Sequence, residues 1–386
     1  MMAILISVTF FALQNKIYFV NQVAKSSNIA IKSVYVTGYS AGSKSYISYL
    51  NNLLDNTEIN AVVVDVKGSD GYVTYNSSLS DVQKYKLTDF AISDIDNLVR
   101  FLHDKNIYVI GRIAVFEDPV YSKARPELAI YDKSKKIQSA DGYPDLSSSV
   151  SWQDNHGLSW LDPASKEVWD YDISLAKDAF YHGFDEVNFD YVRFPSDGNT
   201  KNMGFPFWDG KKEKSEVIKE FFTYTRQQLS TEKISVDLFG ETTINTDDMG
   251  IGQIIEDAFY NFDYISPMVY PSHYANGFQG FTNPAERPYE VIKYSMDSAL
   301  AREKAYYNKL LTENQPTFAK ASADKTKFRP WLQDFNMGAI YDADMVGQEI
   351  KATQDSLGNN FVGFMLWNPS NIYTIERKRQ GYEVKK

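Results

Sequence analysis

The chain has 386 residues, of which 43% are hydrophobic and 23% are charged, and this is the composition of a soluble globular protein. Its net charge of −10 and the absence of a basic stripe argue against a nucleic-acid partner. There is no cysteine, which excludes disulfides and a cysteine nucleophile, and the four His residues are too scattered for a helical zinc pair, so we expect neither a metal site nor a cofactor.

The first residues differ in character from the rest of the chain. Residues 2–13 are almost wholly apolar, as in the hydrophobic region of a signal peptide or a short membrane anchor, although the first basic residue, Lys16, follows this region instead of preceding it. We therefore expect residues 1–31 to form a signal-like or anchor-like segment with a linker, which favours an extracellular or cell-envelope location with possible N-terminal membrane association. The basic residues within 377–386 indicate a solvated C-terminal tail.

Between residues 32 and 376, apolar strands alternate with amphipathic helices. The predicted strands are 33–37, 61–66, 108–116, 187–189, 234–239, 264–269, 328–335 and 361–367. The predicted helices are 43–54, 92–102, 163–182, 217–229, 251–262, 289–311 and 345–357, and for the third of these Asp162 is the expected N-cap and Gly183 the expected end.

Eight such units indicate a single α/β domain, a (β/α)₈ TIM barrel over residues 32–376. The long polar stretch 117–159 predicts a loop excursion after the third strand. No Gly-x-Gly-x-x-Gly sequence opens a helix and no Gly-Lys-Ser/Thr loop is present, so a nucleotide-binding fold has little support.

In a barrel of this kind, residues at the C-terminal ends of the strands converge on one cavity. The polar and aromatic residues at these ends are Asp65, Lys67, Arg112, Glu117, Asp118, Asp190, Arg193, Asp237, Glu241, Tyr270, Ser272, His273, Tyr274, Trp331, Gln333, Asp334, Trp367 and Asn368. Charged groups can hydrogen-bond the hydroxyls of a sugar, and aromatic rings can stack on its apolar face. The set therefore suggests a carbohydrate site.

Cleavage of a glycosidic bond needs a carboxylic acid to protonate the leaving oxygen and a second carboxylate to attack the sugar or activate water. Asp190 is the candidate nucleophile or base, because it ends the most buried strand and has Arg193 nearby to keep it ionised. The acid is either Asp237, which lies within an alternating strand, or Glu241, which follows it. An Asp190–Arg193 ion pair with a purely structural role is the alternative interpretation.

The residues assigned to substrate binding are Asp65, Lys67, Arg112, Arg193, Tyr270, His273, Trp331, Gln333, Asp334, Trp367 and Asn368. Several of them also have a plainer interpretation. Asp65 fits a buried hydrogen-bonding residue slightly better than a participant, and Arg112 could simply pair with Asp65 or Asp190. His273 fits a loop residue better than a proton-transfer group. Trp367 precedes Asn-Pro-Ser at the end of its strand, which favours stacking under a sugar over a core position.

Several segments together resemble a family of glycoside hydrolase barrel domains that is distantly related to the α-amylase-like barrels. These segments are Phe189-Asp190-Tyr191-Val192-Arg193-Phe194-Pro195, Asp237-Leu238-Phe239-Gly240, Ile265-Ser266-Pro267-Met268-Val269-Tyr270-Pro271-Ser272-His273-Tyr274, Arg329-Pro330-Trp331-Leu332-Gln333-Asp334-Phe335 and Gly363-Phe364-Met365-Leu366-Trp367-Asn368. The resemblance implies a (β/α)₈ barrel. In α-amylase-like barrels the nucleophile is an Asp that ends strand four, which Asp190 matches, and the acid is a Glu that ends strand five, which Glu241 matches only approximately.

These observations predict a glycosidase that acts on a cell-envelope or extracellular polysaccharide by a two-carboxylate mechanism. A non-catalytic carbohydrate-binding barrel is the main alternative, and an enzyme of another class is a third, because barrels support many chemistries.

Overall fold

The computed structural model describes residues 29–135, 149–313 and 327–374. The predicted signal-like segment, apart from residues 29–31, and the basic tail lie outside the described residues. Within the described ranges, no helix combines the length and the apolar character that crossing a membrane requires.

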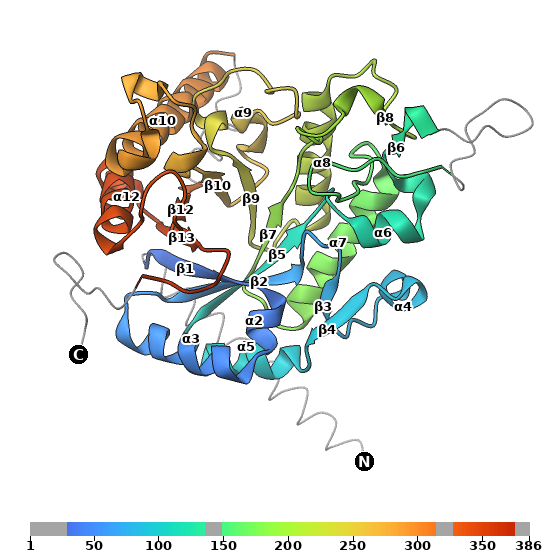
Figure 1. Cartoon of the computed structure of the whole chain (residues 1–386). Helices are drawn as coiled ribbons and strands as arrows, with labels where there is room; N and C mark the ends of the chain where they lie inside the picture. Colours follow the sequence, from blue (N-terminus) through green and yellow to red (C-terminus); the bar gives the residue numbers. More distant parts are fainter. Residues whose placement is uncertain (1–28, 136–148, 314–326, 375–386) are drawn as a thin grey trace, which may run out of the picture.

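Eight parallel strands close into a barrel (Figure 1), which confirms the predicted (β/α)₈ fold. The barrel closes because β1 pairs in parallel with both the last strand and the second strand. The barrel strands are β1 (Ile31–Val36), β2 (Ala61–Lys67), β5 (Tyr108–Ala114), β7 (Glu186–Asp190), β9 (Ile234–Phe239), β10 (Tyr264–Met268), β12 (Trp331–Gln333) and β13 (Gly363–Trp367). The short β11 (Lys327–Phe328) pairs with β10 just ahead of β12.

The strands are buried on both faces, as their apolar sequences require. Strand β2, with the sequence AVVVDVK, has no exposed residue. The side chains of Tyr35, Val63, Ile110 and Met365 meet inside the barrel, and the opposite strand faces pack against the surrounding helices. Because side chains alternate along a strand, the residues two positions after Val63 and Ile110 also face inward, one layer nearer the C-terminal end.

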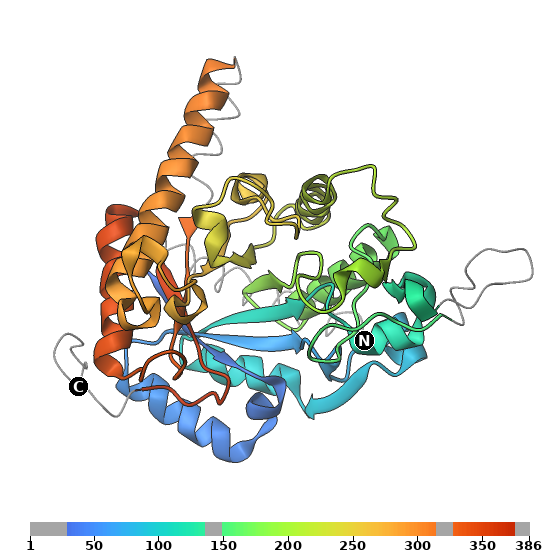
Figure 2. The same cartoon turned by 45° about the horizontal axis from the view of Figure 1, so that its top comes forward.

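Helices surround the barrel as predicted, although one predicted helix is much shorter than expected. The long ones are α3 (Lys44–Asn56), α5 (Ile95–Asp104), α7 (Lys166–Tyr181), α8 (Lys214–Gln228), α10 (Pro288–Thr312) and α12 (Ala343–Leu357). The short ones are α2 (Gly38–Gly42), α4 (Ser80–Tyr85), α6 (Pro119–Ala124) and α9 (Ile255–Ala258), so the predicted helix over 251–262 is mostly loop. Figure 2 shows α10 extending beyond the body of the barrel.

The N-cap of α7 is Ser165 and not Asp162 as predicted. The Ser165 hydroxyl accepts the Val168 N–H at 3.4 Å. The Asp162 carboxylate accepts the backbone N–H groups of Phe207 and Trp208 instead, and so ties the loop after β7 to the start of this helix. The predicted end at Gly183 is confirmed, with a left-handed φ of 94°.

The loop excursion after the third barrel strand is also present. It runs from the end of β5 to α7 and contains α6 and the short β6 (Tyr131–Asp132). Strand β6 pairs in antiparallel fashion with β8 (Met203–Gly204), which lies in the loop after β7. The loops of the third and fourth units are thereby joined. Two further strands, β3 (Val73–Tyr75) and β4 (Thr88–Ile92), extend the sheet beyond β2 and were not predicted.

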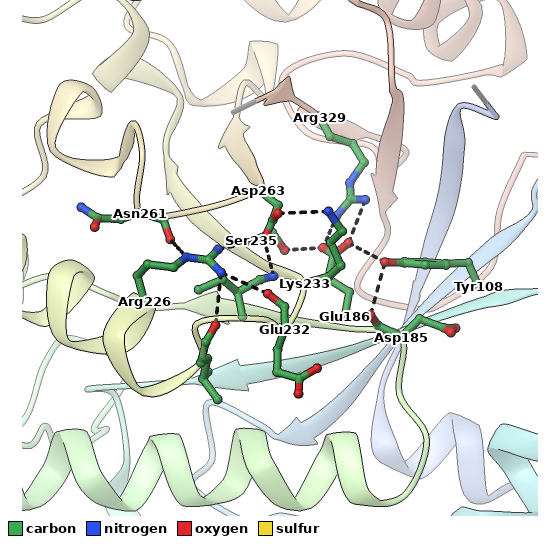
Figure 3. Close-up of polar contacts among 12 residues, drawn as sticks. Tyr108, Asp185, Glu186, Arg226, Glu232, Lys233, Ser235, Asn261, Asp263 and Arg329 are labelled. Carbon is green, nitrogen blue, oxygen red and sulfur yellow. Dashed lines mark hydrogen bonds and ion pairs between the residues drawn. The ribbon is translucent and has the colours of Figure 1, made fainter. Parts of the chain in front are cut away.

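A buried ion pair lies at the N-terminal end of the barrel (Figure 3). The Arg329 guanidinium pairs with the Glu186 carboxylate, and both side chains are completely buried. Ser235 donates to the same carboxylate at 2.5 Å, and the Tyr108 hydroxyl donates to it at 3.3 Å. The barrel floor is therefore polar, but its charges are paired.

Candidate active site

The candidate site is built around Arg112, which bridges two carboxylates at the C-terminal end of the barrel. Its Nε and Nη2 atoms donate to Oδ2 of Asp190 at 3.0 and 2.6 Å, and its Nη1 atom donates to Oδ1 of Asp65 at 2.7 Å. The Tyr35 hydroxyl donates to the other Asp65 oxygen at 2.6 Å. Arg112 therefore holds Asp65 and Asp190 in one network, which agrees with both pairings considered from the sequence.

Asp190 is the last residue of β7, and its carboxylate is tightly held. The next residue, Tyr191, turns into the left-handed region with a φ of 52°. This turn lets the Tyr191 N–H donate to Oδ1 of Asp190 at 2.6 Å. The Asp190 side chain is 10% exposed and that of Arg112 is 11% exposed, so the pair is largely but not completely shielded from solvent.

Asp237 lies on the neighbouring strand, at the same height in the barrel. Phe189 of β7 pairs with Val236 of β9, which places Asp190 and Asp237 at corresponding positions. Asp237 is only 1% exposed. Its Oδ1 atom accepts a hydrogen bond from Asn188 at 2.8 Å, and its Oδ2 atom has no hydrogen-bond partner among the described residues.

Burial, and then the negative charge of Asp190, raise the pKa of Asp237 well above its usual value. Two acidic groups whose environments differ in this way can divide the roles of base and acid. The site thus pairs a carboxylate that a guanidinium neutralises with a buried carboxyl group whose pKa is raised.

A chain of hydrogen bonds connects Asp237 to the barrel floor. Asn188, which donates to Asp237, also donates to the Ser235 hydroxyl at 3.0 Å. Ser235 in turn donates to Glu186, the partner of Arg329 (Figure 3). The position of the acid therefore depends on residues at the opposite end of the barrel.

Glu241, the other acid predicted from sequence, lies in a short 3₁₀ helix after β9. It is partly exposed, and in the portion of the chain that the structure describes its carboxylate forms no ion pair and no side-chain hydrogen bond. Asp237 therefore lies beside Asp190 at the corresponding position of the adjacent strand, where the charge of Asp190 acts on it, whereas Glu241 lies beyond the end of that strand.

Glu117 is a further buried carboxyl at this end of the barrel that the sequence did not single out as catalytic. It follows β5, is 4% exposed, and makes no ion pair with any described residue. Burial raises its pKa to about 8, although the positive charge of Arg193 opposes this shift. The feature of the sequence that could have identified Glu117 is its position directly after a buried strand. Asp118 has the same feature.

Arg193 does not pair with Asp190, so the predicted ion pair is wrong. Its guanidinium lies 4.7 Å from the centre of the Trp160 ring and 4.8 Å from that of Phe239. Its Nη1 atom donates to the Phe194 carbonyl and the Ser196 hydroxyl, both at 3.2 Å. Arg193 therefore braces the loop after β7.

Lys67 does not reach the mouth, so its prediction as a substrate-binding residue is wrong. It is completely buried between Asp118 and Asp172, with its Nζ atom 2.8 Å from an oxygen of each. The reason is a register shift in β2 between Asp65 and Lys67, which breaks the alternation that would keep both on one face. Lys67 faces α7, which carries Asp172.

Gln333, Asp334 and Asn368 are also structural, in contrast to their predicted role in substrate binding. Gln333 donates to the Phe335 carbonyl at 2.9 Å and accepts the Ser272 N–H at 3.2 Å. Asp334 accepts a backbone N–H at 3.1 Å, and Asn368 donates to backbone carbonyls. All three are buried and hold the loops that follow β10, β12 and β13.

An aromatic cluster lies beside the charged network. The Trp367 ring is 5.7 Å from the Tyr270 ring and 4.9 Å from the Phe335 ring, and the exposed His273 ring is 5.2 Å from Tyr270. Trp367 is partly exposed and can offer a face to a sugar. Trp331, predicted to bind substrate, is instead buried inside the barrel, edge-on to Tyr35.

Among the described residues, no group of three or more His, Asp or Glu side chains is arranged to hold a metal ion.

Comparison with known proteins agrees with this fold. A family model described as "Putative glycosyl hydrolase domain" matches residues 33–373. The glycoside hydrolase domain of PgaB (BpsB) from Bordetella bronchiseptica shares the fold, with a TM-score of 0.56, 14% identity, and coverage of 89% of this chain and 95% of that one. A hypothetical protein from Ruminiclostridium thermocellum is 40% identical over 56% of this chain and 98% of its own, with a TM-score of 0.45. Among curated proteins, no sequence matches.

Proposed function

Because the chain belongs to the family of putative glycosyl hydrolase domains, we propose that it is a glycosidase that hydrolyses a bond in a cell-envelope or extracellular polysaccharide. The observation that carries the proposal is the pairing of Asp190 with Asp237. They occupy corresponding positions on neighbouring strands, and only Asp190 has a cationic partner.

In the proposed reaction, Asp190 is the nucleophile, or the base that activates water. Arg112 neutralises its charge and fixes its orientation through two hydrogen bonds. Asp237 is the acid that protonates the leaving oxygen, because burial and the charge of Asp190 raise its pKa and so favour its protonated form. Glu241 lacks a comparable contact, which supports Asp237 over it.

Substrate is proposed to bind across the mouth, with Trp367 and Tyr270 supporting a sugar ring and Asp65 and Arg112 lining the reacting end. Residues 2–13 support a proposal of export or anchoring at the cell envelope. Fractionation of cells that express the full chain, compared with a chain that lacks residues 2–13, tests this location.

The low exposure of Asp237 favours one alternative, a barrel that binds glycans without cleaving them. In that case the Asp65–Arg112–Asp190 network would serve only to stabilise the mouth, and the aromatic cluster would hold the ligand.

A panel of polysaccharides assayed with the wild type, Asp190→Asn and Asp237→Asn separates the two. Hydrolysis requires that at least one glycan is cleaved, and that each substitution lowers kcat by about 10²-fold or more at unchanged fold. Asp297→Asn, on the exposed face of α10, is the matched control. Retained glycan binding without turnover by any variant would establish the binding barrel, and equal turnover by wild type and Asp190→Asn would reject the assigned role.

A further inference from the structure

A surface pocket of about 570 Å³ lies outside the carboxylate network, between the loop after β5 and the loop after β7. The β6–β8 pairing joins these two loops at one side of the barrel (Figure 1). Both loops leave the C-terminal ends of barrel strands, so the pocket opens on the same side of the molecule as Asp190.

The pocket is positively charged in a chain whose net charge is −10. Lys133, Lys201 and Lys214 contribute to its lining, and none of them forms an ion pair with a described residue. Lys214 donates to the Gly250 carbonyl at 2.6 Å, and the negative charge of Asp248 acts on it without a direct ion pair. The single acidic residue of the lining, Asp209, lies 3.2 Å from Lys211.

Aromatic rings line the same pocket. They belong to Tyr131, Phe205 and Trp208. The Trp208 indole N–H donates to the Lys212 carbonyl at 2.8 Å, which fixes the ring, and Phe205 packs edge-on against it at 4.9 Å. Aromatic rings fixed beside ammonium groups that form no ion pair with a described residue suit a sugar that carries an anionic substituent. The aromatic ring can stack on the sugar, while an ammonium group neutralises the anionic substituent.

The loop after β7 starts at Asp190 and supplies most of the residues that line the pocket. Phe194, four residues after Asp190, packs on Trp208 with ring centres 5.2 Å apart. The Lys214 ammonium lies 5.2 Å from the Phe194 ring. The same loop thus packs the pocket lining onto the body of the barrel and ties the pocket to the strand that ends in Asp190.

We propose that this pocket is a binding subsite for an anionic saccharide unit, and that the substrate is a polysaccharide bearing carboxylate, sulfate or phosphate groups. This inference rests on the proposed glycosidase function and specifies its substrate class.

Binding is measured by calorimetry with two matched pairs of probes. Oligogalacturonate is compared with its methyl ester of the same length, and sulfated maltopentaose with unsulfated maltopentaose. The inference expects tighter binding of the anionic member of at least one pair, and weaker binding of that member as salt is raised.

The pocket is tested with Lys133→Glu/Lys201→Glu, two exposed residues whose reversal leaves the barrel core untouched. The control, Lys44→Glu/Lys177→Glu, makes the same change in net charge on the exposed faces of α3 and α7. Reversal of two charge contacts should weaken binding of the anionic probe by roughly tenfold or more, with little change in the control.

Equal affinity for anionic and neutral probes, an equal loss in both variants, or no binding of any probe would overturn the subsite. Turnover of glycans is measured separately. If the protein cleaves no glycan but binds an anionic probe through the pocket, the glycosidase proposal is refuted and the subsite stands. If it cleaves a glycan but binds charged and neutral probes equally well, the subsite is refuted and the glycosidase proposal stands.

Discussion

Replacement of Asp237 by Asn should stabilise the fold at neutral pH while it removes turnover. The carboxyl is buried, accepts a single hydrogen bond from Asn188, and leaves its second oxygen without a partner among the described residues. Burial and the charge of Asp190 hold its pKa well above the usual value. An asparagine keeps the acceptor for Asn188 at nearly the same volume but cannot ionise.

The magnitude follows from proton linkage. A carboxyl whose pKa is higher in the folded chain contributes most to stability below its unfolded pKa, near 3.9, and loses that contribution as pH rises toward the folded pKa. Each unit of difference corresponds to about 1.4 kcal/mol. The Asn variant avoids this loss, so its advantage in free energy of unfolding should grow from about pH 4 upward. For a chain of this length, each kcal/mol should raise Tm by roughly 1–2 °C.

The assay is urea unfolding of wild type and Asp237→Asn between pH 4 and 8, with Asp297→Asn as the exposed control. The control should show no comparable trend. A stability difference that stays constant across this range, or an Asn variant that is less stable throughout, would mean that Asp237 is ionised and partnered, and the assignment of the acid would be lost.

Three other substitutions test the remaining assignments. Lys67→Met should cost about 3–5 kcal/mol at neutral pH, because it leaves two buried carboxylates unpaired. Urea unfolding should show a smaller loss of stability at pH 5, because the pKa of Asp172 is already about 7 with the lysine present and would be higher without it. A variant that is fully stable but binds less glycan would instead indicate that Lys67 binds substrate. Arg112→Lys keeps the charge but cannot span both Asp65 and Asp190, so kcat/KM should fall about tenfold or more on the best glycan of the panel, and unchanged kinetics would contradict the bridging role. Trp367→Ala should weaken oligosaccharide binding in calorimetry by about 1 kcal/mol and leave kcat largely unchanged. Loss of the fold in this variant would instead show that the Trp367 ring serves mainly to stabilise the core.

The barrel could be predicted because the sequence patterns that indicate its strands and helices are local. The Val-rich sequence of β2 and the helical spacing of apolar residues in α5 and α7 each lie within one element. The neighbouring positions of Asp190 and Asp237 were predictable for a related reason, since consecutive strands of a (β/α)₈ barrel lie side by side. The cap of α7 was mistaken because Asp162 and Ser165 are both good caps, and Asp162 is occupied by a distant loop.

The partners of Arg193 and Lys67 could not be predicted. Arg193 lies three residues from Asp190, but the left-handed turn at Tyr191 sends it toward Trp160. Lys67 lies two residues from Asp65, but the register shift in β2 separates them. Both errors assumed regular backbone at a strand end, where irregular backbone is common.

The amino-acid sequence by itself determined the order of strands and helices, and with it which strand ends carry carboxylates. Only the tertiary structure decided that Arg112 neutralises Asp190 and that burial beside Asp190 raises the pKa of Asp237. The physical reason is that the spacing of apolar residues, which determines strands and helices, can be read within a few residues. A pKa depends instead on burial and on charges brought together from distant parts of the chain.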